Sequence, residues 1–98
     1  MQYTQLPPTY KNDTIAEAIY AREIEFFHYE FDANNFRHLL TLLPEGPYQQ
    51  DVQNRLNSTL VQMANVDAIY HALVAQITDP EDYAAAVLRT TEKRKTQL

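Results

Sequence analysis

The sequence contains no cysteine and only one glycine among its 98 residues. Without cysteine the chain has no disulfide scaffold, no thiolate nucleophile and no metal site built on thiolates. Gly46 alone cannot supply the glycine-rich loops that cradle phosphates, or the glycine turns common in small sheet proteins. These shortages favour an all-helical chain that is not a nucleotide-binding fold.

Long apolar runs are also missing. No stretch of 18 apolar residues occurs, and no charged-then-apolar leader begins the sequence. Both features disfavour a membrane span and a secretory signal. We therefore expect a cytoplasmic protein without a membrane partner.

Positive charge is scarce outside the C-terminal end. The formal net charge is -5, with +3 on the last ten residues and -8 on residues 1–88. Four basic side chains spread over those 88 residues cannot form the basic patch of a nucleic-acid binder. We expect no direct nucleic-acid binding by this acidic body. The basic end is explained most simply by cations stabilising a helix C-terminus, and contact with phosphate or an acidic partner is the alternative.

Two stretches without proline or glycine repeat apolar positions at alternating steps of four and three residues. This spacing predicts two long helices, at about 14–43 and 48–77, that each keep one side towards one partner, as in a coiled coil. The short connection around Gly46 requires them to be antiparallel neighbours. We call the predicted contact line between them the seam. Its residues are Ile15, Ile19, Arg22, Phe26, Tyr29, Ala33, Phe36, Leu40 and Leu43 with Val52, Leu56, Thr59, Met63, Val66, Tyr70, Leu73 and Ile77.

A third helix is predicted at about 80–95, because Asp79 is a good N-cap and Pro80 suits the first helical position. Its apolar stripe is short and needs a partner surface. The first helix offers one on the side away from the seam, where four apolar residues step by four, three and four. We call these residues the outer stripe and expect the third helix to fold back onto them. They are Tyr20, Ile24, Phe27 and Phe31.

The predicted fold is therefore all-α, with a long antiparallel helical hairpin and a shorter C-terminal third helix. Dimerisation into a larger bundle stays open. Residues 1–12 are expected to form an extended, proline-containing N-terminal arm, residues 13–95 a single helical domain, and residues 96–98 a frayed C-terminus.

The N-terminal arm contains the sequence Pro7-Pro8-Thr9-Tyr10. This Pro-Pro-x-Tyr pattern resembles the short ligands of WW domains, which dock in a polyproline II conformation on an aromatic groove. The resemblance makes Tyr10 a candidate partner contact. Packing of the arm on the helices is the simpler interpretation.

Residues suited to catalysis are few. Ser58 is the sole serine and lies in the middle of a predicted helix, away from the backbone turns that build oxyanion holes. We therefore expect no enzymatic activity and no cofactor.

One pattern suggests a metal. Glu25 and His28 form a Glu-x-x-His pair, as in carboxylate-bridged di-iron sites, and Asp67 with His71 lies at a similar height on the second long helix. Completed across a dimer, these pairs would make a metal-binding helical protein, although solvated surface positions explain all four residues more simply.

Arg22 is the one charged residue on the seam. The simpler interpretation packs its stem on apolar surface while the guanidinium reaches water or a glutamate. The alternative gives it a role in setting helix register or partner choice.

Seven of the 11 aromatic residues cluster around the first long helix and the facing turn of the second. Two helices cannot cover them all, so the outer ones either pack under the third helix or form an interface. The favoured function is a non-enzymatic protein–protein interaction factor, acting as an adaptor, a chaperone-like factor or an inhibitor. It would present acidic and aromatic helix faces to a larger protein, such as a basic nucleic-acid-processing enzyme, as a homodimer or in a one-to-one complex. A metal-binding protein and a structural subunit of a larger assembly are the alternatives. The candidate partner-binding residues are Tyr20, Ile24, Phe27, Phe31, Arg22 and Tyr10.

Overall fold

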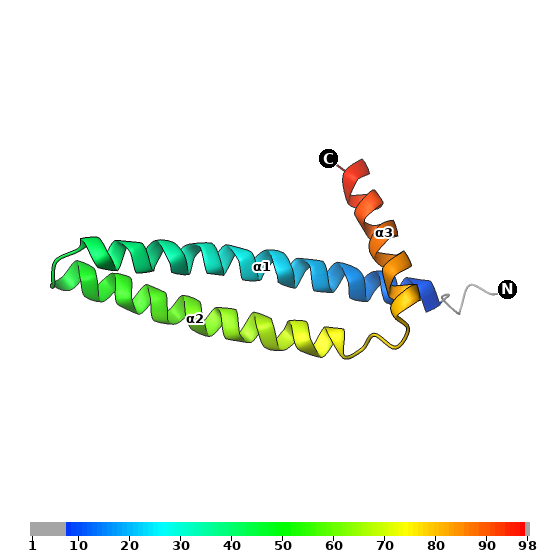
Figure 1. Cartoon of the computed structure of the whole chain (residues 1–98), viewed down its shortest axis with the longest axis horizontal. Helices are drawn as coiled ribbons and strands as arrows, with labels where there is room; N and C mark the ends of the chain where they lie inside the picture. The colour runs from blue at the N-terminus through cyan, green and yellow to red at the C-terminus, as the bar shows by residue number, and fades with distance from the viewer. Residues whose placement is uncertain (1–7, 98) are drawn as a thin grey trace. The chain divides into compact units, whose positions relative to one another are not determined.

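The computed structural model describes residues 8–97, over which the chain forms three α-helices and no β-strand. They are α1 (Pro8–Leu42), α2 (Pro47–Val74) and α3 (Pro80–Thr96), as Figure 1 shows. The prediction of an all-α chain is confirmed. Within this range no helix combines the length and the apolar character that crossing a membrane requires.

The start of α1 differs from the prediction. The helix begins at Pro8, not at Thr14, so the extended arm predicted for residues 1–12 is wrong for residues 8–12, and residues 1–7 lie outside the described range. Proline is tolerated in the first turn of a helix, because the N–H that it lacks would have no partner there. The polyproline II conformation of a WW-domain ligand is therefore not the one that Pro8–Tyr10 adopt, and the side chain of Tyr10 lies outside what the structure describes.

Local hydrogen bonds set the boundary between α2 and α3. The last turn of α2 tightens, with the N–H of Gln76 donating to the carbonyl of Leu73 at 3.0 Å, so the helix ends at Val74 and not at the predicted residue 77. The predicted cap of α3 is confirmed, because Asp79 Oδ1 accepts from the N–H groups of Glu81 at 3.0 Å and Asp82 at 3.3 Å.

At its other end α3 runs through Thr96, beyond the predicted end at residue 95, and is capped by Gln97. The N–H of Gln97 donates to the carbonyl of Arg94 at 3.2 Å. The predicted fraying at residues 96–98 is therefore wrong for residues 96 and 97, and Leu98 lies outside the described range.

The chain divides into two compact units, each described here by itself. The central unit comprises residues 22–69, with the second part of α1 and the first part of α2. The terminal unit comprises the residues up to 21 and from 70 onwards.

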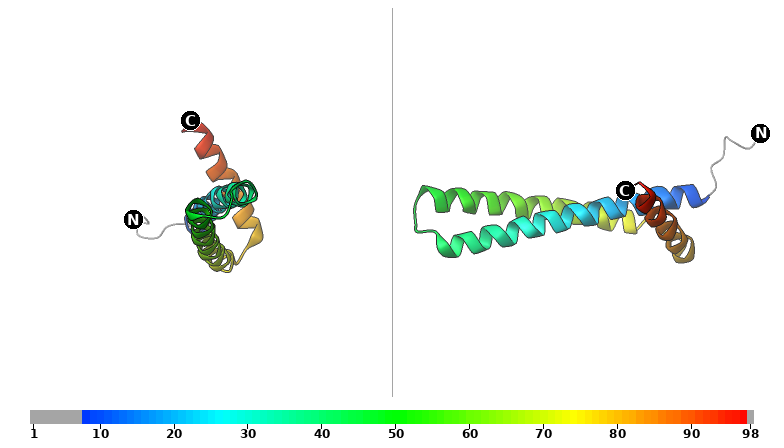
Figure 2. Two further views of the ribbon diagram at one scale, coloured as in Figure 1. Left: turned by 90° about the vertical axis from the view of Figure 1, so that its left-hand side faces the viewer. Right: turned by 90° about the horizontal axis from the view of Figure 1, so that it is seen from above.

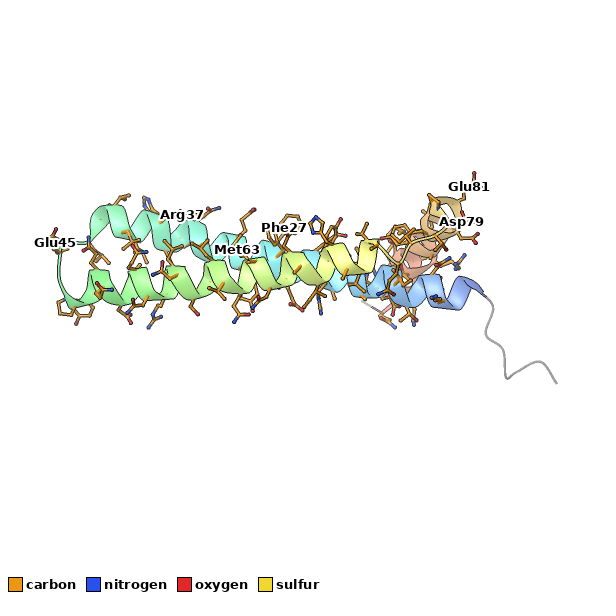
Figure 3. All side chains as sticks on the ribbon, turned by 90° about the horizontal axis from the view of Figure 1, so that it is seen from below. Phe27, Arg37, Glu45, Met63, Asp79 and Glu81 are labelled. Carbon is orange, nitrogen blue, oxygen red and sulfur yellow. The ribbon has the colours of Figure 1, made fainter. Side chains whose placement is uncertain are left out.

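In the central unit the segments of α1 and α2 lie side by side, as Figures 1 and 2 both show. The residues of this unit that are less than a tenth exposed are Ala33, Leu56 and Val66, and all three belong to the seam. The other seam residues of the unit are half-buried. Figure 3 shows Met63 on the side of α2 that faces α1.

The connection between the two segments depends on its glycine. Gly46 precedes α2 with a φ of 154°, a conformation that residues with a Cβ rarely adopt.

The pairing of α1 with α2 as one antiparallel hairpin over their full lengths stays a prediction.

Replacing Ala33 with leucine should destabilise the protein, because Ala33 is completely buried on the seam and the added carbons have no space there. Overpacking of this kind costs about 1–3 kcal/mol, which corresponds to a fall in Tm of at least about 4 °C for a domain of this size. Thermal unfolding followed by circular dichroism measures the change. The matched control is Ala64→Leu, at an exposed position on α2 of the same unit, and equal melting of the two variants would show that the seam is not tightly packed.

Candidate protein interface

The buried residues of the terminal unit come from α1 and α3. Ile15, Ala16 and Ile19 of α1 and Ala86 and Thr90 of α3 are each at most 5% exposed. The buried hydroxyl of Thr90 donates to the carbonyl of Ala86 at 2.9 Å, so its polar group is satisfied within α3. Small side chains on α3 thus let it pack closely in this unit.

Basic side chains of α3 contact two acidic residues on α1. Arg89 holds Asp13 through two of its nitrogen atoms, with Nη2 at 2.7 Å and Nε at 3.2 Å from Oδ1. This hydrogen bond raises the pKa of Arg89 above its already high ordinary value, so the guanidinium stays ionised. Lys93 Nζ lies 3.7 Å from Glu17 Oε1. The basic end of the chain therefore has partners on α1, which stabilisation of a helix C-terminus alone did not predict.

The third basic side chain of α3, that of Arg94, contacts Tyr20. The guanidinium carbon of Arg94 lies 3.6 Å from the centre of the Tyr20 ring, the geometry of a cation–π contact. Tyr20 belongs to the outer stripe, so α3 contacts the stripe at this residue, through a cation and not through the apolar stripe of α3. The two other basic side chains of α3 contact acidic residues, where the prediction placed apolar ones. Asp13, Glu17 and Tyr20 are spaced by four and three residues, so the spacing of the outer stripe, extended towards the N-terminus, was the signal in the sequence that could have found them.

The rest of the outer stripe lies in the central unit and is exposed. Ile24, Phe27 and Phe31 expose 38%, 59% and 67% of their surfaces. Figure 3 shows Phe27 on the side of α1 away from α2. Two exposed glutamates are neighbours of these residues in the sequence, since Glu23 precedes Ile24 and Glu30 precedes Phe31. We call this set the outer face; it consists of Ile24, Phe27, Phe31, Glu23 and Glu30.

The guanidinium of Arg22 reaches a glutamate, as the simpler interpretation of the sequence predicts. Its side chain is 29% exposed, and Nη2 forms an ion pair with Glu25 Oε1 at 2.6 Å. Among the described atoms the buried Nε has no hydrogen-bond partner. A buried donor without a partner costs free energy, so Arg22 is a costly residue for a seam position.

The residues considered for a metal site are divided between the units. Glu25, His28 and Asp67 belong to the central unit and His71 to the terminal unit. Glu25 is engaged by Arg22, and the ring of His71 lies edge-on to Tyr70 with the ring centres 5.6 Å apart. Within residues 8–97 no three side chains of histidine, aspartate or glutamate converge as metal ligands would.

Arg22→Leu should leave the melting temperature equal or raise it by a few degrees, because the substitution removes the unpartnered Nε and keeps an apolar stem on the seam. The oligomeric mass should not change. Circular dichroism and sedimentation measure the two quantities. Arg55→Leu is the control, since that arginine is 65% exposed in its pair with Asp51. A changed mass or a clear loss of stability would instead make Arg22 a determinant of register or partner choice.

Asp13→Arg should loosen α3, because it sets two arginines against each other in place of an ion pair. Amide hydrogen exchange in α3 should accelerate by about threefold to tenfold, and the charge swap Asp13→Arg with Arg89→Asp should restore slow exchange. Asp51→Arg breaks the exposed pair with Arg55 on α2 and is the control. Slow exchange in all these variants would show that the ion pair does not hold α3.

Comparison of the chain with known protein families, with curated proteins and with solved structures finds no match among any of the three.

Proposed function

We propose that this chain is a non-enzymatic protein–protein interaction factor that presents the outer face to a larger protein. The observation that supports it is the exposure of Phe27 and Phe31, at 59% and 67%, four residues apart on one helix. Covering a phenylalanine side chain stabilises a complex by about 1.5–3 kcal/mol. Adjacent exposed aromatic residues are typical of interfaces, where such residues contribute much of the affinity.

The proposal includes the pairing of α1 with α2 as one antiparallel hairpin. The seam pattern is unbroken in the sequence, and the seam residues of the central unit are buried or half-buried. A helix in such a pair covers one side of its neighbour. The opposite side of α1 is then left for another molecule.

The negative charge of the central unit supports a basic partner. Residues 22–69 carry seven acidic side chains and three arginines, a net charge of -4 with histidine neutral. An acidic surface attracts a basic protein over distances of about 10 Å and accelerates association. A basic nucleic-acid-processing enzyme fits this requirement, and the chain would then act as its inhibitor, chaperone-like factor or adaptor. No catalytic residue is assigned, and the sole serine, Ser58, is exposed in the middle of α2.

The test is recovery of the partner by the tagged full chain from its own host cells. The wild-type chain should recover a partner, and the double variant Phe27→Asp with Phe31→Asp should lose it while keeping its helicity, because the charges would be buried in the contact. Sodium chloride added to the wash should weaken the wild-type complex steeply.

The matched control is Leu42→Asp with Val61→Asp, since these side chains are 66% and 58% exposed in the same unit and lie outside the outer face. This variant should recover the partner like the wild type. Equal recovery by all three chains would refute the outer face as the interface. A complex that resists salt would refute electrostatic docking.

A further inference from the structure

We infer that the molecule bound on the outer face is a basic amphipathic helix of the partner protein. This inference rests on the function proposed above and names the chemistry of the segment that docks. Spacing, charge and a contact already present in this chain support it.

The spacing of the outer face matches a helix. Ile24, Phe27 and Phe31 follow one another at steps of three and four, so they form a ridge along α1 about 10 Å long. Ridges of this kind pack against apolar residues with the same spacing on another helix. The backbone groups of α1 are used inside the helix, so this face cannot bind an extended strand by adding to a sheet.

The charge beside the ridge is negative and unpaired. Glu23 and Glu30 are exposed and seven residues apart, which puts them on the same side of α1. Within the described part of the chain neither glutamate forms an ion pair, whereas the neighbouring Glu25 is held by Arg22 at 2.6 Å. A docked helix with lysine or arginine beside its apolar stripe would supply the missing cations.

The terminal unit already contains a contact of this kind. There the basic C-terminal part of α3 places Arg89, Lys93 and Arg94 against two acids and an aromatic ring of α1. The residues contacted are Asp13, Glu17 and Tyr20, which follow one another on α1 at steps of four and three. In the terminal unit α1 therefore binds a basic helical segment of this chain. The outer face of the central unit has the same combination of acidic and aromatic side chains.

Charge also argues against a second copy as the bound molecule. In a two-fold symmetric dimer the same face meets itself. Glu23 and Glu30 of both copies would then lie in one contact, within units that each carry a net charge of -4. Like charges placed together across an interface oppose association.

The experiment titrates the full chain into three fluorescent synthetic peptides and follows anisotropy. The first peptide has leucine at i, i+4, i+7 and i+11 with lysine and alanine elsewhere. The second has the same composition with the leucines scattered, and the third replaces lysine with glutamate. Only the first combines an apolar stripe with positive charge, so it should bind at least about tenfold more tightly than the others.

Two pairs of substitutions should weaken binding of the first peptide in different ways. Phe27→Ala with Phe31→Ala should lower the affinity at least about tenfold at any salt concentration. Glu23→Gln with Glu30→Gln should lower it about threefold or more at low salt and flatten its salt dependence. Leu42→Ala with Val61→Ala, and Glu45→Gln in the connection before α2, are the controls and should bind like the wild type.

Several outcomes would overturn the inference. One is that the first peptide binds no better than the other two, and another is that the outer-face variants bind it like the wild type. Concentration-dependent mass of the free chain that Phe27→Ala with Phe31→Ala abolishes would show that a second copy occupies the face. These failures are distinct from failure of the proposed function. A host partner that is lost with the aspartate variants, together with no binding of the first peptide, would refute only the basic helix. Binding of the peptide, with a host partner that all variants recover, would refute only the proposed function.

Discussion

A contact between two helices covers only one side of each helix. This geometric limit determines which apolar residues of α1 stay exposed. In the central unit the best-buried residues, Ala33, Leu56 and Val66, all lie on the seam. Every apolar residue away from the seam needs another partner or stays in water. The exposure of Phe27 and Phe31 follows from this limit, because they share a helix with the seam and lie on its other side.

The periodic part of the fold could be predicted from the sequence, because burial along a helix repeats every three or four residues. The seam and the Asp79 cap depend on such local patterns. The start of α1 could not be found in this way. Asn12, Asp13 and Thr14 are all good N-caps, while Pro8 suits the first turn of a helix, so both starting points satisfy local rules. The contact of Arg89 with Asp13 joins residues 76 positions apart, and no local pattern selects that pair over another acid.

The candidate interface was only partly predictable. The outer stripe is visible in the sequence as a second period, but period alone does not separate a stripe that another element covers from one that is exposed. The structure separates its members. The ring of Tyr20 contacts the guanidinium of Arg94 in the terminal unit, whereas Ile24, Phe27 and Phe31 are 38–67% exposed in the central unit. The exposure of a ring is a tertiary property, since it depends on which segments pack against that ring and not on its position in the repeat.

The charged and the apolar side chains of α1 make different contributions to its contacts. Exposed ion pairs contribute little net stability because solvent screens them and long side chains lose freedom. The burial of Ile15, Ala16 and Ile19 with Ala86 therefore stabilises the terminal unit, and its ion pairs set which residues of α3 meet which residues of α1. We expect the same two contributions at the outer face. Apolar contact with the phenylalanines would supply the affinity, and the glutamates beside them would select a cationic helix and accelerate its arrival.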